Sequence, residues 1–252
     1  MQGLLVLNYP SYDFHRWHGT LLLFAVITVA LLFNTYLAKQ LPKIEGAVLI
    51  VHIVGFFGVL ITLVYLAPHG SAHDVFVKYL NSGGYDKGTS FFVGLITTVF
   101  AFVGADGAIH MSEEIINAST VVPNSLVASI GLNGAMGFSM LIAILFCIGD
   151  IESALSTPTG FPFIEIFRQA VNTNAGATAM SAVVLSLMIF ATIAVLAAAS
   201  RMMWAFARDN GLPGSRFISQ VEPRTKLPLY SVGLSVMITM LLGLINIGSS
   251  AA

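Results

Sequence analysis

Six long apolar runs divide this sequence and decide what it can fold into. They cover residues 20–38, 46–67, 90–112, 124–149, 178–200 and 228–247. A helix that crosses the hydrocarbon core of a bilayer needs about 20 mainly apolar residues. Strands of a membrane barrel would alternate apolar and polar residues, and these runs do not alternate. The sequence therefore predicts an all-α polytopic membrane protein.

The low content of charged residues supports the same prediction. Only 9% of the 252 residues are charged, whereas a soluble domain carries about 25%. A bilayer explains this deficit because a surface that faces lipid should be apolar. The formal net charge is -1, so the chain has no basic footprint for nucleic acid. The composition therefore predicts the lipid bilayer as a partner and no nucleic acid.

Lysine and arginine are distributed unequally between alternate loops. The segment from Arg201 to Lys226 carries most of the excess, and Lys39 and Lys43 follow the first run. Positively charged loops stay on the cytoplasmic side of a membrane. The sequence therefore predicts that the loops after the first, third and fifth runs are cytosolic. The host membrane, plasma or internal, stays undetermined.

The third run contains an acid between two glycines, in the stretch VFAFVGADGAIHMSEEIINASTVVP at residues 99–123. An ionised aspartate at the bilayer centre costs about 2.5 to 3.5 kcal/mol on insertion scales, and each glycine weakens a helix by about 1 kcal/mol. We therefore expect a discontinuous helix around Gly104, Asp106 and Gly107. Its first half would be Ser90–Val103, and its second half would begin near His110. Broken helices at membrane depth form substrate sites in many secondary transporters, where free carbonyl groups replace water around a charged ligand.

Two alternatives accompany that interpretation. The third run could be a kinked structural helix whose Asp106 pairs with a lysine or arginine, although no such residue lies within the six runs. The segment HMSEEI places His110 and Glu113 at a spacing that suits metal ligands, with Glu114 beside them. Two ligands are weak grounds for a metal site, and a polar helix end is the commoner explanation, so no metal is predicted.

Three segments carry a resemblance to a known family: FVGADGAIHMSEEIINASTVVP, FCIGDIESALSTPTGFPFIEIF and SRMMWAFARDNGLPG. They resemble the amino acid–polyamine–organocation superfamily of secondary transporters, and most closely its fungal amino acid/choline/GABA permease branch. The resemblance implies a fold of two inverted five-helix repeats. On that map the whole chain, 1–252, is a partial permease transmembrane domain that corresponds to the fourth to ninth helices of the family. It would then be a fragment that does not transport alone.

The resemblance also implies roles for individual residues. Phe100 matches an aromatic residue that closes over the substrate, and Asp106 matches an acid linked to proton coupling. Thr192 matches a small hydroxyl residue that lines the site from the eighth helix. The unwound backbone would bind the substrate amine. This backbone comprises Ala101, Phe102, Val103, Gly104, Ala105 and Gly107.

The expected function is secondary active transport of an amino acid or a related amine of the GABA, choline or polyamine class. The resemblance supplies the substrate class and the coupling to protons, while the broken helix and the acid indicate transport independently. No enzymatic activity and no cofactor are expected, because an intramembrane aspartyl protease needs two acids in adjacent spans and only Asp106 lies in one. A non-transporting membrane subunit or receptor-like fragment is the alternative that the sequence leaves open.

Overall fold

The computed structural model describes residues 1–79, 81, 84–100 and 102–248, and this part of the chain contains helices and connecting loops without a strand. Within it, five helical segments are long and apolar enough to cross a membrane. They are Arg16–Thr35 (α2), Ala38–Leu66 (η1, Ala38–Gln40, with α3, Leu41–Leu66), Ala118–Cys147 (α7), Asn174–Arg208 (α10) and Leu229–Gly248 (α12, Leu229–Gly243, with α13, Ile245–Gly248).

Shorter helices connect these long ones. They are α1 (Gln2–Asn8), α4 (Ala72–Phe76), α5 (Lys87–Phe100), α6 (Gly107–His110), η2 (Ser112–Glu114), α8 (Ile151–Leu155), α9 (Pro162–Val171) and α11 (Ser215–Ile218). The third apolar run thus contains two short helices, α5 and α6, instead of one long helix.

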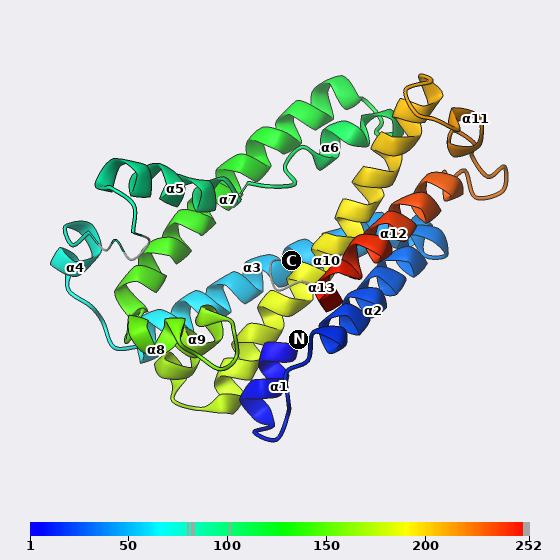
Figure 1. The fold of residues 1–252 in the computed structure, drawn as a ribbon. Coiled ribbons are helices and arrows are strands. Elements are labelled where there is room, and N and C mark those ends of the chain that lie inside the picture. Colours follow the sequence, from blue (N-terminus) through cyan, green and yellow to red (C-terminus); the bar gives the residue numbers. More distant parts are fainter. Residues whose placement is uncertain (80, 82–83, 101, 249–252) are drawn as a thin grey trace.

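Helices α2, α10 and α12 lie side by side and form one half of the body (Figure 1). Their contact buries Ile27, Ala30, Ile193, Leu196 and Val236. A second buried cluster joins α3, α7, α9 and α10 and includes Leu63, Cys147, Phe167 and Ala177. The alanines matter here because small residues let helix backbones approach closely in a membrane. Helix α10 belongs to both clusters and is the central helix of the described structure.

A buried asparagine reinforces the contact between α2 and α10. Asn34 is fully buried, and its Nδ2 donates to the carbonyl oxygens of Ala30 on its own helix and Ile193 on α10, each at 3.0 Å. A polar residue within a span commonly bonds a neighbouring helix in this way.

Large apolar side chains cover much of the outer surface. On α3, Ile50, Val54 and Ile61 are each more than half exposed. A soluble monomer rarely shows apolar patches of that extent, whereas a surface that faces lipid or neighbouring helices requires them.

Several helices are longer than the apolar runs that predicted them. Helix α10 starts at Asn174 because the Thr173 hydroxyl accepts from the Gly176 amide at 3.2 Å and caps it. It also continues past Ser200 to Arg208, with arginines in its last turns. Helix α7 begins at Ala118, ahead of Pro123, which lies inside it. Helix ends that leave the hydrocarbon region need not be apolar, so hydropathy underestimates the length.

Candidate functional site

The third apolar run is interrupted where the sequence predicts it. Helix α5 ends at Phe100, the backbone turns through Phe102–Asp106, and α6 starts at Gly107. Four-residue turns replace the regular helical hydrogen bonds here: the Ala105 amide donates to the Phe102 carbonyl at 3.3 Å, and the Gly107 amide donates to the Gly104 carbonyl at 3.1 Å. Gly104 has a φ of 92°, a conformation that other residues rarely adopt. The second half starts at Gly107, earlier than the expected start near His110, and is short: a single turn of α6 that ends at His110, followed by η2.

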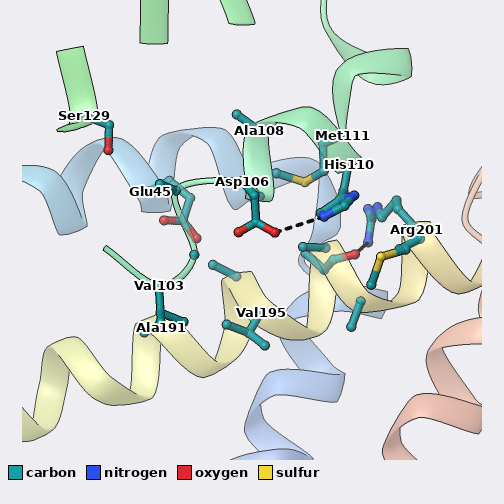
Figure 2. A pocket seen from close by; sticks show the side chains of 18 of the residues that line it. Glu45, Val103, Asp106, Ala108, His110, Met111, Ser129, Ala191, Val195 and Arg201 are labelled. Atoms are coloured by element: carbon teal, nitrogen blue, oxygen red, sulfur yellow. Dashed lines mark hydrogen bonds and ion pairs between the residues drawn. The ribbon is translucent and has the colours of Figure 1, made fainter. Parts of the chain in front are cut away.

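A cavity of about 840 Å³ lies against this interruption (Figure 2). Its other walls come from the start of α3, the middle of α7 and the alanine-rich face of α10. Since alanine side chains are small, that face of α10 leaves room in front of the interruption. The side chains and backbone that line the cavity include Pro42, Glu45, Phe102, Val103, Gly104, Ala105, Asp106, Gly107, His110, Glu114, Ser129, Asn133, Ala191, Ala194, Val195 and Arg201.

Most of the predicted site residues meet at this cavity. Phe102, Val103, Gly104, Ala105, Asp106 and Gly107 all line it. Thr192 is not among the lining residues; its hydroxyl donates to the Met188 carbonyl of its own helix at 2.9 Å, and its neighbour Ala191 faces the cavity instead. Ala101 lies outside the described residues, and the structure describes the backbone of Phe100 but not its side chain.

Four ionisable residues that the sequence did not assign to a substrate site also line the cavity. They are Glu45, His110, Glu114 and Arg201. For His110, the sequence did contain a local indication of its place in the site. It follows Asp106 by four residues, and side chains four residues apart share a helix face. Glu45 and Arg201 lie at the ends of long apolar runs, where charged residues are ordinary.

Two pairs of ionisable side chains line the cavity. His110 Nε2 lies 3.1 Å from Asp106 Oδ2, and Arg201 Nε lies 3.0 Å from Glu114 Oε1. The partner of Asp106 is therefore a histidine, and not the lysine or arginine that a structural kink would use. Glu45 has no ion-pair partner among the described residues, so the cavity carries more negative than positive charge.

The two glutamates of HMSEEI are bonded to arginines of α10. Glu113 forms a two-pronged bond with Arg208, in which Nη1 and Nη2 each lie 2.9 Å from a carboxylate oxygen, and Glu114 binds Arg201. In the described part of the chain, no group of three or more potential ligands is placed to hold a metal ion.

Comparison with known proteins identifies the family of the chain. The family described as amino acid permease matches residues 1–252, the whole chain. The chain belongs to the amino acid permease family. Its five apolar helices and its family agree that it is a multi-pass integral membrane protein. The family is one of transporters rather than enzymes.

Several fungal transporters are similar to this permease chain. A Macrophomina phaseolina protein that carries the provisional name amino acid/polyamine transporter is 34% identical over 91% of the chain and 51% of its own length. The choline transporter of Saccharomyces cerevisiae is 34% identical over 99% of the chain and 45% of its own length. The GABA-specific permease of the same yeast is 28% identical over 77% of the chain and 36% of its own length. The chain spans about half the length of the first two relatives. No solved structure matches it significantly.

Proposed function

We propose that this chain forms the substrate cavity of a secondary transporter for an amino acid or a related amine. The observation that carries the proposal is that the interrupted backbone between α5 and α6 forms one wall of the 840 Å³ cavity. Pockets for small ligands measure about 300–1,000 Å³. Interrupted helices in transporters bind charged substrates through peptide groups that a regular helix would use internally.

The charges of the cavity favour a ligand with a positively charged nitrogen. Arg201 is neutralised by Glu114, and the carboxyl groups of Glu45 and Asp106 remain among the lining side chains (Figure 2). The turn at Phe102–Asp106 adds carbonyl oxygens, which attract cations. Choline and GABA, named in two of the relatives, both carry such a nitrogen. The apolar alanine face of α10 would contact the remainder of the ligand.

Proton coupling is the second part of the proposal, with Asp106 as the coupling acid. The carboxyl group of Asp106 lines the cavity, so a cationic substrate there would interact with it. Asp106 ends the interruption and begins α6, so its charge state and the shape of the substrate site can influence one another. Such mutual influence is what coupling requires. Phe100, at the end of α5, is proposed to close over the bound substrate.

Uptake by the full-length protein in proteoliposomes tests both parts. A panel of radiolabelled amino acids, GABA, choline and polyamines would be measured with and without an inward proton gradient. We expect saturable, competed uptake of at least one amine, concentrated only when the gradient is present. Absence of saturable uptake across the panel would overturn the transport function.

The Asp106→Asn variant tests the coupling acid. It should still exchange substrate but lose gradient-driven accumulation and most of the dependence on pH. Asp86→Asn is the matched control, since Asp86 caps α5 through Thr89 and Gly88 outside the cavity. If Asp106→Asn concentrates substrate as well as the unmodified protein does, Asp106 is not the coupling residue.

A further inference from the structure

Asp106 and His110 form a pair at the cavity wall, directly after the interruption. Asp106 is the N-cap of α6 and His110 is its last residue, so the two side chains lie on one face. His110 Nε2 is 3.1 Å from Asp106 Oδ2 (Figure 2). The His110 side chain is 30% exposed and the Asp106 side chain is 65% exposed, and both line the cavity. The pair is therefore open to water or ligand within the cavity.

The geometry of this pair indicates where a proton would reside. When Asp106 is ionised, His110 Nε2 must carry the hydrogen that it donates to Oδ2. The lone pair of the neutral ring is then at Nδ1, for which the structure shows no partner among the described residues. Imidazole is the side chain that ordinarily changes charge between about pH 5 and 8. A carboxylate bonded to the opposite nitrogen stabilises the charged ring.

We propose that the proton that couples through Asp106 binds His110 Nδ1 and not the carboxylate itself, and that Asp106 stays ionised as the counter-ion of the ring. This inference rests on the proposed function, because it specifies how the cavity responds to a proton gradient. A proton from water adds to the lone pair of Nδ1 and gives an imidazolium that keeps its Nε2–H bond to Asp106. The net charge of the pair changes from -1 to zero. Release to water on the other side of the membrane restores the neutral ring.

The neighbouring charged groups are compatible with this assignment. Helix α6 packs against α10, α7 and η2. Arg201 from α10 and Glu114 from η2 face the cavity but neutralise each other at 3.0 Å. Helix α7 contributes the uncharged side chains of Ser129 and Asn133. Glu45 from α3 is the remaining acidic group of the described lining.

The position of Asp106 explains how proton and substrate would interact. Its backbone ends the turn that forms the substrate wall, and its carboxylate bonds His110. A cationic ligand that attracts this carboxylate would weaken its bond to the ring and favour the loss of the proton. Occupation of one site therefore changes the affinity of the other.

Uptake by the full-length protein with the His110→Gln variant is the first test. Glutamine keeps an N–H donor for Asp106 but cannot gain charge. We expect substrate exchange to persist, while gradient-driven accumulation and the pH dependence of uptake are lost. His73→Gln on α4, outside the cavity lining, is the matched control and should leave both unchanged.

The outcomes separate this inference from the proposed function. If His110→Gln retains the pH profile while Asp106→Asn loses it, the proton binds the carboxylate and the inference is wrong, although coupling through Asp106 stands. If the unmodified protein transports without any response to a proton gradient, proton coupling itself is wrong, and the inference is overturned with it.

The second test locates the hydrogens directly. Nitrogen-15 spectra of histidine-labelled chain in lipid nanodiscs distinguish the two ring nitrogens, and the His110 signals are those absent from His110→Gln. We expect the neutral ring to carry hydrogen at Nε2 and to gain one at Nδ1 on acidification. A neutral ring with its hydrogen at Nδ1 would overturn the inference, because Nε2 would then accept a hydrogen from a protonated Asp106.

Discussion

Arg201 binds Glu114 across 87 residues of sequence, with the guanidinium Nε donating to the carboxylate Oε1 at 3.0 Å. The Arg201 side chain is only 7% exposed, whereas that of Glu114 is 57% exposed. Arg201 Nη1 also donates to the Ser200 hydroxyl at 3.4 Å. A buried guanidinium is costly unless an anion compensates it. Glu114 therefore holds the segment after the interruption against α10.

Removal of the charge of Glu114 should destabilise the protein. Glu114→Gln leaves the buried Arg201 guanidinium without its anion, and we expect the free energy of unfolding to fall by about 2 kcal/mol. Glu113→Gln is the matched control, because its partner Arg208 is 46% exposed and water can replace the lost carboxylate. Thermal unfolding in detergent should show the larger decrease in Tm for Glu114→Gln. Equal decreases in Tm for the two variants would show that burial of the Arg201 guanidinium does not make its ion pair more important.

The contact between α2 and α10 should depend on Asn34. Asn34→Ala removes the hydrogen bond to the Ile193 carbonyl at 3.0 Å, and side-chain bonds between membrane helices contribute about 0.6 to 1.7 kcal/mol. Asn133→Ala is the control, because Asn133 Nδ2 donates to Ser129 Oγ within its own helix α7. Titration with a denaturing detergent should unfold Asn34→Ala first. Similar unfolding midpoints for the two variants would show that the hydrogen bond between α2 and α10 does not contribute to stability.

Local sequence features predicted the helices and the interruption because both depend on neighbouring residues. The length of an apolar run determines whether a helix can span the membrane. The two glycines on either side of Asp106, Gly104 and Gly107, determine where the helix is interrupted. The sequence did not predict that Glu114 meets Arg201 or that Glu113 meets Arg208. These pairs join residues 87 and 95 positions apart, and they meet because α6, which precedes η2 in the chain, packs against α10. The length of the helix after the interruption was also overestimated. The structure has only the short α6 followed by η2 there.

The bond from Arg208 to Glu113 should make stability depend on pH. Hydrogen bonding from the Arg208 guanidinium lowers the pKa of Glu113 below its ordinary value of 4.5. A carboxyl group whose pKa is lower in the folded state contributes stability above its unfolded pKa, and this contribution is lost as the pH falls through the folded value. The difference in Tm between the unmodified protein and Glu113→Gln should therefore be present at pH 7 and shrink below about pH 4.5.

Salt provides the control for that prediction. Glu113 and Arg208 are both about half exposed, so their attraction should weaken as ionic strength rises. The Tm difference at pH 7 should be smaller in 1 M salt than at low salt. A difference that stays constant from pH 7 to pH 3 would indicate that Glu113 acts through packing and not through its charge.

Gly104 should tolerate alanine poorly, although space is available. No atom lies within 4 Å of the position that an added Cβ would occupy, but the φ of Gly104 is 92°. An alanine in such a conformation costs about 1 to 2 kcal/mol, so Gly104→Ala should lower Tm and reduce substrate uptake by disturbing the turn. Gly94 is the matched control: it lies inside α5 without a positive φ and is equally uncrowded. There alanine should stabilise the helix by about 1 kcal/mol. The two identical substitutions should thus shift Tm in opposite directions, and a stabilising Gly104→Ala would mean that the chain passes through Phe102–Asp106 as a regular helix.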